Sequence, residues 1–143
     1  MSLERYVKAQ APVYERALGE LKRGHKQSHW MWFVFPQIAG LGNSAMSHAY
    51  AIQSLEEARE YLAHPVLGAR LRECCHVLQG LEGKTAHEIF RSPDDLKLRS
   101  CLTLFARAAP NEGLFDNLLV KYFGSKEDPA TLEVLAGKAS DGL

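Results

Sequence analysis

Apolar residues recur along the chain at the spacing that places them on one face of an α-helix. The clearest case is Tyr14, Ala17, Leu18 and Leu21, which fall at i, i+3, i+4 and i+7. Because an α-helix completes a turn in about 3.6 residues, these four side chains form one stripe that a hydrophobic core can cover. The stripe predicts a helix near residues 12–22.

Residues that start and stop helices frame further stripes of the same kind. Proline, as at Pro12, is tolerated at the first helical position, and a Ser or Thr three residues before a Glu forms a capping box. Ser54 and Thr85 begin such boxes, and Ser92 precedes Pro93 as a capping hydroxyl at a third start. We therefore predict an all-α fold with helices near residues 12–22, 55–63, 66–79, 93–108 and 114–123, and shorter helices over 45–51, 86–90 and 129–135.

Residues 30–35 form the one segment whose pattern fits two structures. Six apolar residues followed by Pro36 suit a buried strand by length and composition. A single strand without partners cannot form a sheet, however, and every other element is predicted to be helical. We interpret the segment as a short helix or an extended stretch at the centre of one domain over residues 1–137, with a flexible tail over residues 138–143.

The balance of charge narrows the classes of partner. The chain has 143 residues, of which 17 are Lys or Arg and 17 are Asp or Glu, so its formal net charge is +0. A nucleic-acid or anionic-membrane partner would favour clustered Lys and Arg, and we expect neither. We also expect no membrane segment, because no apolar stretch approaches the ~20 residues that span a bilayer. The charged N-terminus has no apolar signal core, which favours a cytoplasmic protein.

The chain has an odd number of cysteines, and two of them are adjacent in sequence, which makes a poor disulfide framework. The three are Cys74, Cys75 and Cys101. All three fall on apolar helical stripes, so we expect reduced, buried and protonated thiols rather than a nucleophile. This also favours the cytoplasm.

His29 is the candidate for acid–base catalysis, because imidazole titrates near neutral pH and adjoins two tryptophans here. The alternative is a histidine at the edge of the core that hydrogen-bonds to the backbone. His25 and His29 have the i, i+4 spacing of two metal ligands on a helix, but no third ligand is evident. We therefore expect no metal site and no cofactor.

Residues 26–37 combine flat apolar side chains with charged and polar ones, as the wall of a ligand pocket does. In this interpretation the tryptophans stack on the ligand, two lysines hold an anionic group, and an amide and a hydroxyl orient it. The same tryptophans would serve equally as a well-packed core with a polar rim. The candidate ligand-binding residues are Lys26, Ser28, Trp30, Trp32, Gln37 and Lys97.

Two neighbouring features bear on an anionic ligand. Gly40 and Gly42 form a G-x-G loop that can act as an anion nest or simply as a turn with Asn43 or Ser44 as helix cap. The loop has neither the third glycine nor the preceding strand of a dinucleotide fingerprint. In the helix after residue 93, Asp95 and Arg99 are spaced as an i, i+4 ion pair on a solvated face. The alternative is that Lys97 or Arg99 turns inward to the ligand.

Four segments together resemble a known family. Residues 9–14, 28–37, 61–68 and 92–100, and above all the run S-H-W-M-W-F-x-F-P-Q, are similar to bacterial domain-of-unknown-function family 1810, whose members have sometimes been mislabelled calpastatin. The resemblance spans roughly residues 3–136. It implies a small multihelical cytoplasmic protein, and it supplies no reaction. Some relatives are joined to domains that handle ADP-ribose, which implies a nucleotide-related ligand.

Two hypotheses about function follow. In the first, the protein binds or acts on a small anionic ligand, such as a nucleotide or an ADP-ribose derivative, with His29 as general acid or base. In the second, it is a non-catalytic helical adaptor whose surface helices contact another protein, and the aromatic side chains are only core. A cleft that converges on His29, Lys26 and Lys97 would favour the first hypothesis. A buried, solvent-free segment over residues 28–37 with no adjoining cavity would favour the second.

Overall fold

The structure is a computed structural model that describes the backbone of residues 2–141 and the side chains of residues 2–137. Within this range the regular elements are helices, and the one sheet-like pairing is a parallel bridge between Ile38 and Ile52. The predicted all-α fold is confirmed. The helices are α1 (Glu4–Gln10), α2 (Tyr14–Lys22), α3 (Met31–Val34), α4 (Ala45–Ala49), α5 (Leu55–Ala63), α6 (Leu67–Gly80), α7 (Ala86–Phe90), α8 (Asp94–Ala108), α9 (Leu114–Phe123) and α10 (Pro129–Asp141).

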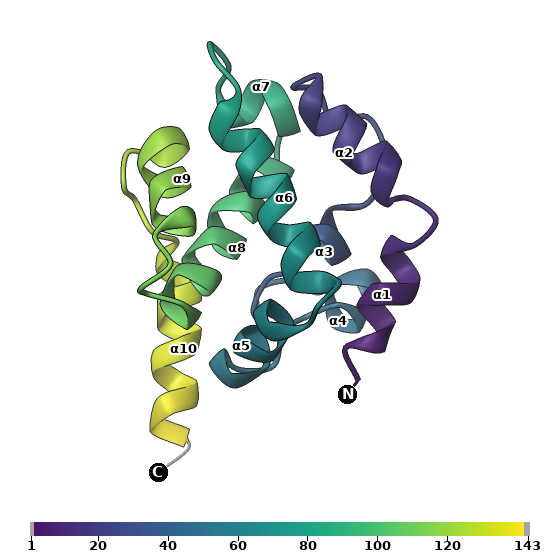
Figure 1. Ribbon diagram of the computed structural model, residues 1–143. Helices are drawn as coiled ribbons and strands as arrows, with labels where there is room; N and C mark the ends of the chain where they lie inside the picture. Colours follow the sequence, from purple (N-terminus) through teal and green to yellow (C-terminus); the bar gives the residue numbers. More distant parts are fainter. Residues whose placement is uncertain (1, 142–143) are drawn as a thin grey trace.

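Helix α8 is the centre of the domain. It contacts α5, α7, α9 and α10, while α6 lies against α2, α5 and α9 (Figure 1). The predicted stripe of α8 is fully buried because helices surround it on several sides; its members are Leu98, Cys101, Leu102 and Phe105. The first turns of α8 and Arg107 near its end reach the surface, while the middle of the helix is buried.

The helices predicted near residues 12–22, 55–63, 66–79, 93–108 and 114–123 begin and end within two residues of those limits, whereas α10, predicted over 129–135, runs to Asp141. The capping box at Thr85 is present, since its side chain accepts from the Glu88 N–H and Glu88 accepts from the Thr85 N–H. The ambiguous aromatic run contains a short helix, α3. The prediction for Pro12 was wrong, because this residue lies in the turn before α2.

Two features at helix starts were not predicted correctly. Ser92 does not cap α8; Pro93 takes the N-cap position without a side-chain hydrogen bond, and the Asp95 N–H donates to the Arg91 carbonyl at 2.9 Å. Helix α1 was missed because its two buried residues are Tyr6 and Gln10, and a buried glutamine leaves no apolar stripe.

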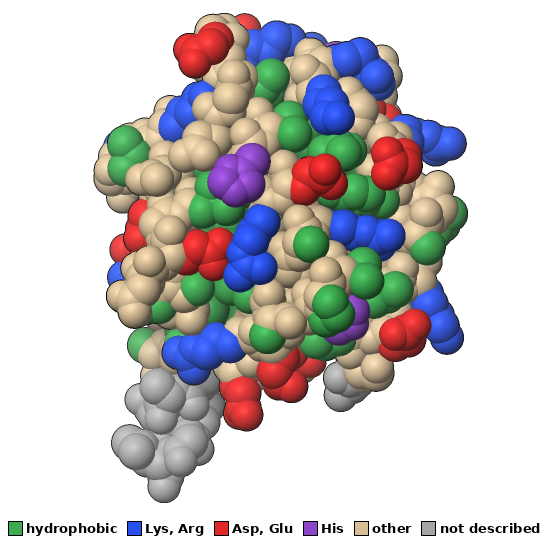
Figure 2. All heavy atoms as spheres, in the orientation of Figure 1, with side chains coloured by type: hydrophobic (Ala, Val, Ile, Leu, Met, Phe, Trp, Pro, Cys, Tyr) green, Lys and Arg blue, Asp and Glu red, His purple; other side chains and the backbone are tan. Residues whose placement is uncertain are grey.

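The C-terminal part of α10 extends beyond the other helices (Figure 1) and runs to Asp141. The tail predicted over residues 138–143 therefore begins with helical backbone, and residues 142–143 lie outside the described part of the chain. No helix within the described range is long and apolar enough to cross a membrane. On the face drawn in Figure 2, basic, acidic and apolar side chains are interspersed.

All three cysteines are free and buried, as predicted. Burial raises the pKa of the Cys74 thiol to about 12, and it raises the pKa values of Cys75 and Cys101 well above their usual range. These thiols therefore stay protonated at neutral pH and are poor nucleophiles.

Candidate functional site

The segment before α3 is held by the buried carboxylate of Glu20, which is 2% exposed. Its Oε1 accepts from the backbone N–H of Gln27 at 2.8 Å, from that of Ser28 at 3.0 Å and from the Trp30 indole N–H at 2.9 Å. The Ser28 hydroxyl donates to Oε2. The polar atoms of Ser28 and Trp30 are thus committed to the interior of the protein.

Glu20 is ionised in the folded protein. Burial by itself raises the pKa of a carboxyl group, but the hydrogen bonds from Ser28, Gln27 and Trp30 outweigh it and lower the pKa of Glu20 to about 2. No cation pairs with Glu20 among the described side chains, so these four donors carry the stabilisation of its charge.

Lys26 is also occupied within the protein. Its Nζ lies 2.9 Å from Asp94 Oδ2, donates to the Ser28 carbonyl at 2.6 Å and lies 4.9 Å from the centre of the Trp30 ring. Only 7% of its side chain is exposed. Lys26 therefore joins the segment before α3 to the start of α8.

A cavity of about 520 Å³ lies between the loop that follows α3 and the first turns of α8. Three of the predicted ligand-binding residues, Trp32, Gln37 and Lys97, lie on its lining. The full set of lining residues is Trp32, Gln37, Ile38, Ala39, Gly40, Leu41, Gly42, Asn43, Ser47, His48, Ala51, Gln53, Pro93, Leu96, Lys97, Ser100 and Ala130. The other predicted residues, Lys26, Ser28, His29 and Trp30, lie outside it.

Lys97 brings a positive charge to the lining, and its ammonium group lies over the Trp32 ring. Lys97 Nζ lies 5.2 Å from the centre of the Trp32 ring and 3.6 Å from Asp94 Oδ1. Asp94 contacts Lys26 at a shorter distance than Lys97, so Lys97 is the more loosely paired of the two lysines. With 25% of its side chain exposed, Lys97 can approach a group in the cavity.

The loop opposite α8 is closed at its base. The Ile52 N–H donates to the Gln37 carbonyl at 2.8 Å, and the Ala39 N–H donates to the Ile52 carbonyl at 2.8 Å. From α1, Arg5 Nε donates to the Ala49 carbonyl at 3.0 Å. These bonds fix both ends of the loop that carries the residues opposite Lys97.

The two glycines of the predicted anion nest lie on the lining. Gly40 has a φ of +102°, which favours glycine, and a Cβ on Gly42 would lie 2.5 Å from Ser47 Oγ. Ser44 caps α4 by accepting from the Ser47 N–H at 3.0 Å. The turn with a Ser44 cap is thus present, and the glycines let it run close to the cavity.

Several lining residues escaped the sequence analysis because their neighbours in sequence carry no recognisable motif. The cavity has three carboxamides, from Gln37, Asn43 and Gln53, and an imidazole from His48. Ser100 Oγ donates its proton to Asp128 Oδ2 at 2.8 Å, which leaves a lone pair to accept from a ligand. The lining, as described, contains no carboxylate side chain.

His29 is exposed and precedes α3. Its imidazole makes no hydrogen bond or ion pair with the described residues, so the bond to the backbone that the alternative interpretation required is absent there. Residues 25–30 are not helical, and so His25 and His29 do not share a helix face. Over the described residues no three His, Cys, Asp or Glu side chains are grouped to hold a metal ion.

The catalytic role of His29 stays a prediction that His29→Ala tests. Because imidazole would act as the proton donor or acceptor, a catalytic His29 requires that the variant lose turnover of a ligand found by screening. Circular dichroism and cooperative melting would check that it still folds. Full retention of binding and turnover would contradict the assignment.

The predicted ion pair between Asp95 and Arg99 is wrong. Asp95 Oδ2 instead lies 3.3 Å from His87 Nδ1, and Arg99 Nη2 lies 3.6 Å from Asp128 Oδ1. His87 on α7 and Asp128 before α10 therefore take the place of the i, i+4 partner within α8. Of the two cations considered for the ligand, Lys97 lines the cavity and Arg99 turns to Asp128.

Comparison with known proteins gives the family. Residues 1–135 match the family described as "Protein of unknown function (DUF1810)". The chain belongs to this family. The motif-based prediction is confirmed, and the match covers the cavity and every element from α1 to α9. No curated protein matches the chain.

A solved structure supports the same fold. The conserved hypothetical protein Rv1873 from Mycobacterium tuberculosis is 52% identical to this member of the DUF1810 family, with a TM-score of 0.92. The similarity covers 94% of this chain and 96% of the other. Its description names no ligand or reaction, so function has to be inferred from the cavity.

Proposed function

We propose that the protein binds a small anionic ligand of the nucleotide or ADP-ribose class in the cavity between α8 and the loop of residues 37–53. The observation that carries this proposal is the joint placement of Trp32, Gln37 and Lys97 on one lining that, in the described structure, has no carboxylate side chain. Such a lining favours negative charge, and the nearby carboxylates of Asp94 and Asp128 are each in contact with a lining residue, Lys97 and Ser100.

Each group has a distinct chemical part. Lys97 supplies the positive charge, and the loose 3.6 Å contact with Asp94 leaves it able to pair with a phosphate or carboxylate. Trp32 supplies a flat apolar wall for a sugar or base. Gln37, Asn43 and Gln53 can each donate and accept, as recognition of a base edge or a ribose requires.

The size of the cavity supports the same class of ligand. Pockets for small molecules and cofactors usually measure about 300–1,000 Å³, and this one measures about 520 Å³. Because it adjoins residues 28–37 through Trp32 and Gln37, the solvent-free segment that would favour an adaptor is not what these residues form. Of the three residues whose convergence would favour a ligand, Lys97 lies on the lining. His29 and Lys26, however, do not converge on it.

Location is a further part of the proposal. Cys74, Cys75 and Cys101 are free thiols buried in the core. Such thiols suit the reducing cytoplasm that the sequence predicted, and a cytoplasmic protein would meet nucleotide ligands.

Replacing Lys97 tests the proposal. We expect the wild-type protein to bind ADP-ribose in isothermal titration calorimetry, and Lys97→Met to weaken binding by about tenfold or more, because a charge-assisted contact contributes about 1.5–3 kcal/mol. Lys22→Met is the matched control, since Lys22 is an exposed lysine at the end of α2, remote from the lining. Equal losses in the two variants would refute a specific role for Lys97.

The alternative, a helical adaptor, has no comparable observation. The large exposed apolar side chains are Met46, Leu96 and Val120, which lie on three different helices of the described structure. Leu96 also lines the cavity. If nucleotides, ADP-ribose derivatives and other small anions all fail to raise the melting temperature, the adaptor becomes the better hypothesis.

A further inference from the structure

His48 is a second lining residue that can carry a positive charge. It lies on α4, whereas Lys97 lies on α8, so the two reach the cavity from different elements. They are the only side chains of the described lining that can be cationic. A ligand with one negative charge would engage Lys97 alone and leave His48 without a role.

The surroundings of His48 leave its imidazole free for a ligand. The ring makes no hydrogen bond or ion pair within the described structure, and His48 is exposed. The charged groups near it are few. Lys97 shares the cavity and contacts Asp94, and Arg5, which donates to the neighbouring Ala49 carbonyl, is paired with Glu57 at 3.5 Å.

We propose that the ligand carries two negative charges, one held by Lys97 and the other by protonated His48, so that binding strengthens as the pH falls. This inference rests on the proposed function and specifies the charge of its ligand. Imidazole can gain a proton near neutral pH, and an anion beside it favours the protonated form. Binding therefore takes up a proton and becomes tighter in mildly acidic solution.

ADP-ribose is the probe, because its two pyrophosphate charges do not change between about pH 6 and pH 8.5. We expect the wild-type protein to bind it about five to ten times more tightly at about pH 6 than at about pH 8.5. A change of this size is expected if ligand binding raises the pKa of the imidazole by roughly one unit. Calorimetry in buffers of different ionisation enthalpy should also show proton uptake near pH 7.

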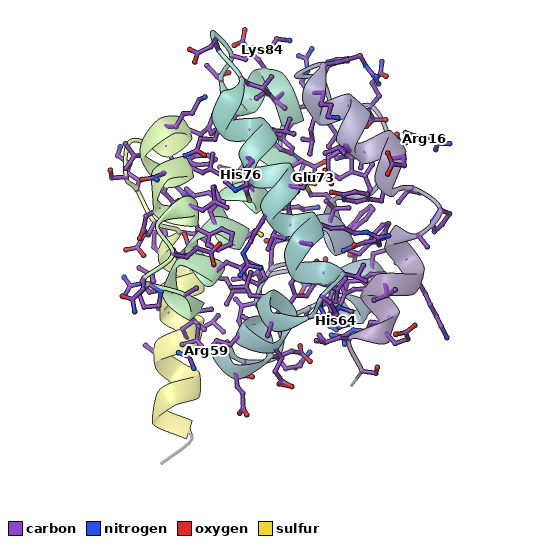
Figure 3. The ribbon with its side chains drawn as sticks, viewed as in Figure 1. Arg16, Arg59, His64, Glu73, His76 and Lys84 are labelled. Carbon is purple, nitrogen blue, oxygen red and sulfur yellow. The ribbon has the colours of Figure 1, made fainter. Side chains whose placement is uncertain are left out.

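His48→Gln should abolish both the pH dependence and the proton uptake, since glutamine cannot be protonated. His76→Gln is the matched control: His76 is an exposed residue of α6 (Figure 3) that is not on the cavity lining. It should keep the wild-type ratio of affinities. A melting curve for each variant checks that the fold is intact.

The outcomes separate this inference from the proposed function. If the wild-type protein binds neither ADP-ribose nor a nucleotide at either pH, both fail. If it binds through Lys97 but shows no pH dependence, or if His48→Gln keeps the wild-type ratio, the proposed function stands and the role of His48 is overturned. Loss of the ratio in His48→Gln but not in His76→Gln supports it.

Discussion

Replacement of Trp30 by alanine is expected to lower the free energy of unfolding by about 3–5 kcal/mol, the usual cost of truncating a large buried aromatic residue. Trp30 is 0% exposed, and its ring centre lies 6.2 Å from that of Phe35. The substitution leaves a cavity at the start of α3 and removes one of the donors to Glu20. Urea unfolding followed by circular dichroism measures the change.

Trp32→Ala is the matched comparison, because the two tryptophans are two residues apart and have opposite surroundings. Trp32 is only half-buried and lies on the cavity, so its replacement should cost less stability and should weaken ADP-ribose binding. If Trp32→Ala were the more destabilising variant, or if Trp30→Ala melted like the wild-type protein, the division between a packing and a binding tryptophan would be wrong.

Glu20→Gln is expected to lower the free energy of unfolding by about 2–4 kcal/mol at pH 7, because buried hydrogen bonds to a charged acceptor are replaced by weaker or mismatched ones. A glutamine has one acceptor oxygen where the carboxylate has two. The oxygen can still accept from the N–H groups of Gln27 and Trp30, but without the negative charge, and the Ser28 hydroxyl then faces an NH2 group and has to change from donor to acceptor. Chemical denaturation again provides the measurement.

The effect should depend on pH in a defined direction. The pKa of Glu20 is lowered from 4.5 to about 2 on folding, so its contribution to stability is present above the unfolded value and is lost as the pH falls through the folded one. The difference between the wild-type protein and Glu20→Gln should thus be smaller at pH 3 than at pH 7. Glu15→Gln, an exposed change on the same helix, should show little difference at either pH. A gap that widened in acid would contradict this account.

Local pattern was sufficient for most helices because helix formation depends on residues three and four positions apart. The stripe of Tyr14, Ala17, Leu18 and Leu21 is buried as predicted. Helix α1 escaped because Gln10 is buried through hydrogen bonds to the Phe33 carbonyl at 2.6 Å and to the Tyr61 hydroxyl at 3.0 Å. Those partners are distant in sequence, so no local pattern could reveal them.

Proximity in sequence was a poorer guide to the site. Residues 26–37 hold all but one of the predicted ligand-binding residues, yet the chain divides them between two environments. Ser28 and Trp30 turn to Glu20, whereas Trp32 and Gln37 turn to the cavity. Lys97 lies on the lining because the helix start at Pro93 puts it in the first turns of α8, and its contact with an anion stays a prediction.

The sequence by itself determined the family, the helical class, the limits of five helices between residues 12 and 123 and the burial of the cysteines, since motifs, caps and apolar stripes depend on near neighbours. Only the tertiary structure decided which polar groups face the cavity. Asp94 forms an ion pair with Lys26, and Glu20 accepts a hydrogen bond from Trp30. Because these partners are distant in sequence, only the fold shows that Lys26 and Trp30 lie outside the cavity. The loop closed by Ile38 and Ile52 brings His48 to the same cavity as Lys97, although 48 residues lie between His48 and Lys97 in the sequence.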